Sequence, residues 1–121
     1  MTNSDFKLTS EQVKQDGKTP VTIFYLRGWL DAQCEEKLFT ATQEAHSQGA
    51  LKIVFHLEDV QILTSAGIRI LQKIYRLLTP DSKISGMRLC NAPTQVYHAL
   101  SLTGFLQTVP MYESLQAALD S

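Results

Sequence analysis

The sequence lacks the features that mark membrane, secreted or nucleic-acid-binding proteins. Its longest apolar run, Ile23 to Leu26 with Val21 nearby, is far too short to span a bilayer. Its first residues lack the basic and then apolar pattern of a secretory signal peptide. Lysine and arginine form no run, and 11 basic side chains nearly balance 12 acidic ones. We therefore expect a cytoplasmic, soluble protein that neither inserts into a membrane nor binds nucleic acid.

Cysteine and histidine are also sparse, and their spacing matches no familiar metal site. Cys34 and Cys90 could pair, but without a secretory signal two buried thiols are expected. The histidines at positions 46, 56 and 98 share no metal-ligand spacing, and no glycine-rich phosphate loop is present. The sequence thus predicts no metal and no cofactor. Its 121 residues, 44% of them apolar, fit one domain over residues 1–121 with a single core.

Residues 51–71 contain the clearest structural pattern. The β-branched run at 53–55 is typical of a buried strand, and a polar break at 56–59 follows it. After the small residues at 64–67, apolar side chains recur at helical spacing, which predicts a helix beginning near Ser65. Its expected buried stripe consists of Ile70, Leu71, Ile74, Leu77 and Leu78.

The remaining patterns predict an α/β domain with the order β-β-α-β-α-β-α-β-α. Strands are expected over 6–13, 21–26, 53–55, 87–90 and 107–111. Helices are expected between Asp31 and Gly49 and over 65–78, 93–104 and 113–119. A turn at 16–20 would join the first two strands in a hairpin. Alternating strands and helices imply a mostly parallel sheet of four or five strands, here with an antiparallel edge and with helices chiefly on one side.

Ser65 is the residue that most needs an explanation. A helix start carries unpaired backbone N–H groups and a partial positive charge, so it favours a capping hydroxyl, a bound anion or a phosphate. Thr64 and Ser65 place two hydroxyls at this position. The residues alone favour a structural cap over a functional serine.

The helix after Ser65 has a second face with Ile68, Gln72 and Tyr75 at helical spacing from the serine. Large apolar residues beside a serine suggest a docking patch on an exposed face. The alternative is that Ile68 and Tyr75 pack against a neighbouring helix or loop. Asp31, ahead of the first helix, is suited to an N-cap role.

With these residues placed, the chain resembles a STAS domain, the family of the anti-sigma factor antagonists. Residues 27–32, Arg-Gly-Trp-Leu-Asp-Ala, resemble the family's Gly-x-Leu-Asp turn before the first helix. Residues 57–62 resemble the segment that leads into the family's switch motif. Residues 64–68, Thr-Ser-Ala-Gly-Ile, stand where the family has Asp-Ser-Ser-Gly-Leu or Asp-Ser-Ala-Gly-Leu. Residues 102–105, Leu-Thr-Gly-Phe, are similar to its Leu-Thr-Gly-Leu/Phe segment.

The resemblance implies a regulatory binding protein with no enzymatic activity, a STAS-type mixed sheet and about four helices. Ser65 would be the acceptor of a phosphate from a partner that is both anti-sigma factor and serine kinase, and a PP2C-type phosphatase could remove it. Thr64 replaces the family's usual Asp and is an alternative acceptor. The residues expected to bind the partner are Asp31, Thr64, Ser65, Gly67, Ile68, Gln72 and Tyr75.

Two other functions are considered. A constitutive STAS module would sit in a larger signalling or transport assembly, with Ser65 never modified. A hydrolase could be assembled on paper from Ser65, His56 and Asp31, but no Gly-x-Ser-x-Gly nucleophile elbow surrounds the serine.

Overall fold

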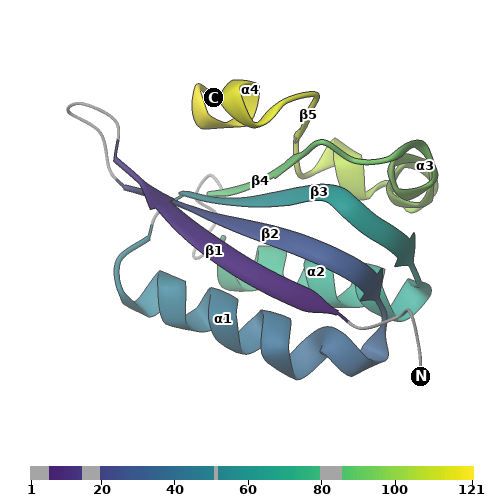
Figure 1. Cartoon of the computed structure of the whole chain (residues 1–121). Coiled ribbons are helices and arrows are strands. Elements are labelled where there is room, and N and C mark those ends of the chain that lie inside the picture. The colour runs from purple at the N-terminus through teal and green to yellow at the C-terminus, as the bar shows by residue number, and fades with distance from the viewer. Residues whose placement is uncertain (1–5, 15–19, 51, 80–85) are drawn as a thin grey trace.

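In a computed structural model, the chain forms one five-stranded sheet whose strands lie side by side in sequence order (Figure 1). The structure describes residues 6–14, 20–50, 52–79 and 86–121. The first strand pair is antiparallel and the other pairs are parallel, so the predicted mixed, mostly parallel sheet is confirmed. The strands are β1 (Lys7–Val13), β2 (Val21–Leu30), β3 (Lys52–Leu63), β4 (Met87–Cys90) and β5 (Met111–Tyr112).

The helices divide unequally between the two faces of the sheet (Figure 1). The α-helices are α1 (Glu35–Ser47), α2 (Ser65–Leu77), α3 (Thr94–Leu102) and α4 (Leu115–Leu119), and the 3₁₀ helices are η1 (Ala32–Cys34) and η3 (Phe105–Gln107). Side chains of α1, α2 and α3 share the larger hydrophobic cluster, whereas α4 covers part of the opposite face. The predicted order of elements and the excess of helices on one side are both confirmed.

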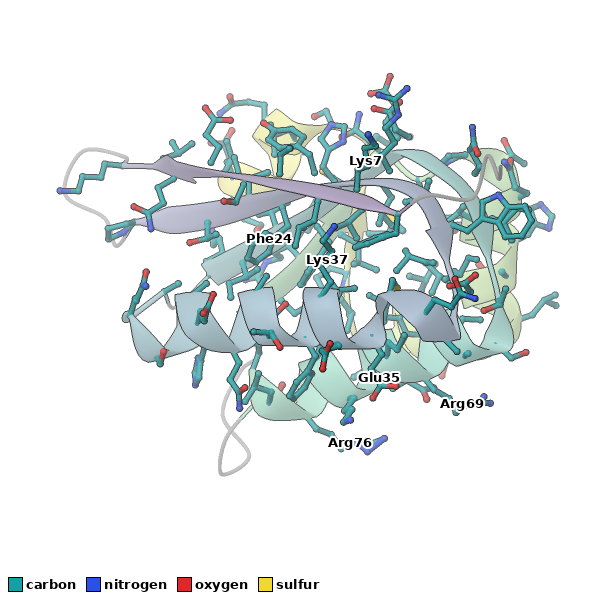
Figure 2. The ribbon with its side chains drawn as sticks, turned by 60° about the horizontal axis from the view of Figure 1, so that its bottom comes forward. Lys7, Phe24, Glu35, Lys37, Arg69 and Arg76 are labelled. Atoms are coloured by element: carbon teal, nitrogen blue, oxygen red, sulfur yellow. The ribbon has the colours of Figure 1, made fainter. Side chains whose placement is uncertain are left out.

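The alternation of side chains along β2 explains this division. Phe24 and Leu26 belong to the larger cluster, and Phe24 points from the sheet toward the helices (Figure 2). Val21 and Ile23 belong to the smaller cluster, together with Leu119 of α4. Because successive strand residues point to opposite faces, a strand buried on both sides is apolar at nearly every position.

The polar break predicted at 56–59 is wrong, because β3 continues through it to Leu63. Its partner β2 extends to Leu30 and pairs with this part of β3. Tyr25 pairs with His56 and Arg27 with Asp59, so β3 carries one extra residue between these pairs. This bulge keeps the two strands paired while the side chains on one face change from apolar to polar.

The last predicted strand is present but shifted toward the C-terminus. Residues 105–107, partly included in the expected strand, form η3 instead. Gly104 begins this turn with a φ of 77°, a left-handed conformation that favours glycine. Strand β5 is then only Met111–Tyr112, directly after Pro110. The pairing of β1 with β2 confirms the hairpin, and the turn predicted at 16–20 lies largely outside the described residues.

Candidate functional site

The predicted switch region lies where β3 ends and α2 begins, and Thr64 holds this junction together. The Thr64 hydroxyl accepts a hydrogen bond from the backbone N–H of Gly67 (3.2 Å) and donates one to the carbonyl oxygen of Leu30 (3.2 Å). The backbone N–H of Thr64 donates to the same carbonyl (3.1 Å). Thr64 is therefore the N-cap of α2 and also ties the helix start to the end of β2.

Ser65 is the first residue of α2, and its side chain is exposed. Its hydroxyl makes no hydrogen bond to any residue that the structure describes. The interpretation of Ser65 as a structural cap is therefore wrong, because Thr64 already provides the cap. Ser65 is exposed at a helix N-terminus, with the first N–H groups of α2 beside it.

Gly67 and Ile68 are buried and hold the helix start against the sheet. A Cβ atom on Gly67 would lie 2.1 Å from the Leu30 carbonyl oxygen, so only glycine allows this approach of α2 to β2. Ile68 is 8% exposed and belongs to the larger hydrophobic cluster. The hypothesis that Ile68 flanks the serine on an exposed face is therefore wrong, and the alternative that it packs inside is confirmed.

Gln72 and Tyr75 are partly buried and lie further along α2. Together they line a pocket of about 380 Å³ between α2 and residues 103–108. Tyr75 also packs against the larger hydrophobic cluster, so part of its side chain has the packing role that was the alternative to docking. Arg76 lines the same pocket but is absent from the predicted set of site residues. The sequence does give a signal for Arg76, because the helix that contains it has cationic side chains and no acidic residue to pair with them.

Asp31 caps the short helix η1, as its sequence position predicts. Its carboxylate accepts a hydrogen bond from the backbone N–H of Gln33 (3.0 Å), and its side chain is partly buried. Asp31 directly follows Leu30, whose carbonyl oxygen binds Thr64. The turn that contains Asp31 is thus joined to the turn that contains Ser65.

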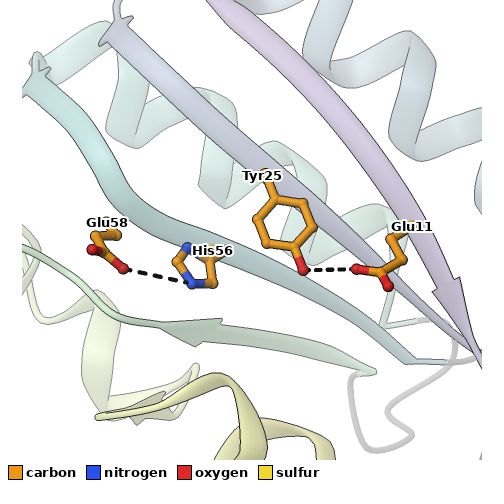
Figure 3. Close-up of polar contacts among 4 residues, drawn as sticks. All are labelled: Glu11, Tyr25, His56 and Glu58. Carbon is orange, nitrogen blue, oxygen red and sulfur yellow. Dashed lines mark hydrogen bonds and ion pairs between the residues drawn. The ribbon is translucent and has the colours of Figure 1, made fainter.

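His56 contacts Tyr25 and Glu58 (Figure 3), and no hydrogen bond joins it to Ser65 or Asp31 among the described residues. Its ring lies 5.1 Å from the ring of Tyr25, and its Nε2 lies 4.0 Å from a carboxylate oxygen of Glu58. The Tyr25 hydroxyl donates to Glu11 (2.8 Å), and this hydrogen bond and burial raise the pKa of Tyr25. The structure therefore does not bring His56 into a hydrolase site with Ser65.

The two cysteines are free, buried thiols, as expected. Burial raises the pKa of Cys34 and of Cys90 to about 11, so both remain protonated and unreactive at neutral pH. Among the described residues, no group of three or more histidine, cysteine or acidic side chains could hold a metal ion. No helix in the same part of the chain is long and apolar enough to cross a membrane.

Comparison with known proteins finds relatives over most of the chain. The family model of the STAS domain matches residues 12–118. The anti-sigma F factor antagonist of Paenibacillus polymyxa is 25% identical over 109 residues, which are 89% of this chain and 92% of that protein.

Solved structures agree with this match. The crystal structure of an anti-sigma factor antagonist from Mycobacterium paratuberculosis aligns with a TM-score of 0.75 and 25% identity, covering 94% of this chain and 92% of that one. The Bacillus cell fate determinant SpoIIAA in its phosphorylated form has the same fold, with a TM-score of 0.69 and 19% identity. That alignment covers 94% of this chain and 97% of the Bacillus chain.

Proposed function

The chain belongs to the STAS domain family, and we propose that it is an anti-sigma factor antagonist. Such a protein acts by binding an anti-sigma factor, which then releases its sigma factor. The similar proteins named as anti-sigma factor antagonists in Paenibacillus polymyxa and Mycobacterium paratuberculosis support this function. The activity proposed for this chain is binding, and any phosphate transfer is carried out by the partner.

We further propose that phosphorylation of Ser65 switches the binding. The observation that carries this proposal is the exposed Ser65 hydroxyl, which has no hydrogen-bond partner among the described residues. A phosphate there would meet the unpaired N–H groups and the positive end of the helix dipole, so the fold should tolerate it. The partner would instead face about two additional negative charges at the interface.

The geometry supports Ser65 over Thr64 as the acceptor. The Thr64 hydroxyl both donates and accepts a hydrogen bond, and phosphorylation of Thr64 would remove the proton that it donates to the Leu30 carbonyl oxygen. Ser65 can lose its hydroxyl proton without breaking any contact that the structure describes. Thr64 is thus the cap of α2, and the position before Ser65 carries a hydroxyl instead of the family's usual Asp.

The test is phosphorylation by a candidate anti-sigma factor with serine kinase activity from the same organism, with ATP and magnesium. Intact mass and fragmentation mass spectra should show one phosphate, located on Ser65. Ser65→Ala should remain unmodified, whereas the control variant Ser114→Ala should be modified as the wild type is. A PP2C-type phosphatase should remove the phosphate.

An unmodified wild type, or a phosphate found on Thr64, would contradict the proposed switch. If the unmodified protein then binds its partner as tightly as Ser65→Ala and Ser65→Asp do, the chain is a constitutive module. Such a module would belong to a larger signalling or transport assembly.

A further inference from the structure

Helix α2 carries three cations and no acidic residue, and one of the cations, Lys73, has an ion-pair partner in the part of the chain that the structure describes. Lys73 forms an ion pair with Glu35 of α1 (2.7 Å) and lies 5.0 Å from the centre of the Phe39 ring. Arg69 and Arg76 are exposed and have no ion-pair partner among the described residues. Both side chains project from α2 away from the sheet (Figure 2).

Arg76 also lines the pocket of about 380 Å³ between α2 and residues 103–108. Tyr75 and Phe105 provide aromatic walls, while Gln72 and Thr108 add polar groups. The Thr103 hydroxyl is engaged, because it donates to the Leu100 carbonyl oxygen (2.8 Å). The cationic group of the pocket is thus a guanidinium, whose fork of donors suits a carboxylate.

Leu102 adds an apolar element next to this pocket. It is the last residue of α3 and is 87% exposed, the largest exposure of the bulky apolar residues that the structure describes. It belongs to the Leu-Thr-Gly-Phe segment, of which residues 103–105 line the pocket. An exposed apolar side chain adds area that a partner can bury, and arginine is enriched at protein interfaces.

We propose that the pocket lined by Gln72 and Arg76, together with Arg69 and Leu102, binds an acidic segment of a protein partner. A carboxylate of that segment lies against Arg76, and an apolar side chain of the same segment covers Leu102. The proposal rests on the antagonist function and adds the chemistry of the partner's surface. Two unpaired arginines and a formal net charge of −1 favour a protein over a nucleic acid, which requires a larger basic patch.

This surface is continuous with the proposed switch. Arg69 follows Ser65 by four residues, which places the two side chains one helical turn apart on the same side of α2. A phosphate on Ser65 therefore competes with the partner's carboxylates for Arg69. The phosphate weakens binding both by repulsion and by neutralising a cation that the partner needs.

The experiment uses charge reversal on the full chain. Arg69→Glu and Arg76→Glu are compared with Lys37→Glu, which changes the net charge equally at an exposed position of α1 (Figure 2). Two probes are titrated at low and high salt: a candidate anti-sigma factor from the same organism, and an acetylated peptide of alternating glutamate and leucine. Each arginine variant should weaken binding about tenfold, and Lys37→Glu should not change it. Thermal unfolding should be unchanged in all three variants.

The outcomes separate this proposal from the antagonist function. If the anti-sigma factor binds wild type and Arg76→Glu equally well, the acidic-segment proposal is overturned while the antagonist function stands. A different result is that the anti-sigma factor does not bind, while the peptide shifts amide resonances of α2 and η3 and Arg76→Glu abolishes those shifts. That result would support the acidic-segment proposal and overturn the antagonist function. A single-stranded oligonucleotide of equal charge that binds more tightly than the peptide would overturn the choice of a protein partner.

Discussion

Helices α2 and α4 each have a serine at their start, as the first residue of α2 and as the N-cap of α4, and the two serines have opposite roles. Ser114 is the N-cap of α4, and its hydroxyl accepts a hydrogen bond from the backbone N–H of Ala117 (3.1 Å). Ser65 lies one position further along, as the first residue of α2, because Thr64 is the cap. The comparison shows that a serine at a helix start is available to a partner when its neighbour satisfies the helix.

The two helix starts also differ in how firmly they are held. The third residue after the cap is Gly67 in α2 and Ala117 in α4. Gly67 packs against the backbone of β2 with no space for a side chain, whereas Ala117 is exposed. The serine of α2 is therefore presented from a helix start that is fixed to the sheet, as a precise binding site requires.

Gly67→Ala should cause the largest loss of stability and so separate the two helix starts most clearly. The new Cβ would lie 2.1 Å from a backbone oxygen of Leu30, so the helix start or the strand end must move. We expect the free energy of unfolding to fall by about 3–5 kcal/mol. The matched variant Ala117→Gly should lose only about 0.5–1 kcal/mol, from helix propensity. Urea denaturation measures both, and equal losses would show that α2 is not held by this contact.

Ile68→Glu should have the next largest effect. Its side chain is 8% exposed within the larger cluster, and an unpaired carboxylate cannot remain charged there without disrupting the packing. We expect a loss of about 2–4 kcal/mol. Leu102→Glu, at a position 87% exposed, should stay within about 0.5 kcal/mol of wild type. If Ile68→Glu were as stable as wild type, Ile68 would not be part of the core, and the hypothesis that it lies on an exposed docking face would be restored.

Removing the hydroxyls of Thr64, Ser114 and Ser65 one at a time should produce the smallest losses of stability, and the three losses should differ. Thr64→Ala loses the cap and the hydrogen bond to Leu30, and we expect a loss of about 1–2 kcal/mol. Ser114→Ala loses a more exposed cap, at about 0.5–1 kcal/mol. Ser65→Ala should remain within about 0.5 kcal/mol of wild type, because its hydroxyl has no contact to lose among the described residues. Thermal denaturation that ranks Ser65→Ala with Thr64→Ala would contradict this assignment of the cap.

Local patterns in the sequence were enough to predict the order of elements and the position of the switch serine. Strands β2 and β4 are apolar runs, and α2 has a regular apolar stripe, so periodicity alone identifies them. The helix start at 64–65 follows from two hydroxyls before that stripe. The choice of Thr64 as the cap could not be made, because both hydroxyl residues satisfy the same local rule.

The features that were missed depend on contacts between distant parts of the chain. β3 continues past His56 because β2 pairs with it beyond that point. Gly67 is required because the carbonyl oxygen of Leu30, far away in sequence, occupies the space of a side chain. The pocket near Arg76 forms only when residues 103–108 fold against α2. No pattern within a short window encodes such contacts.

The central claim is that Ser65, and not the capping serine of the other helix, controls partner binding. The most direct test measures dissociation constants for a candidate anti-sigma factor from the same organism. The variants compared are Ser65→Ala, Ser65→Asp, Ser114→Ala and Ser114→Asp. We predict that Ser65→Ala binds as wild type does, that Ser65→Asp binds at least about tenfold more weakly, and that the two Ser114 variants bind equally well. Equal affinities for Ser65→Ala and Ser65→Asp, with both variants folded, would contradict the account.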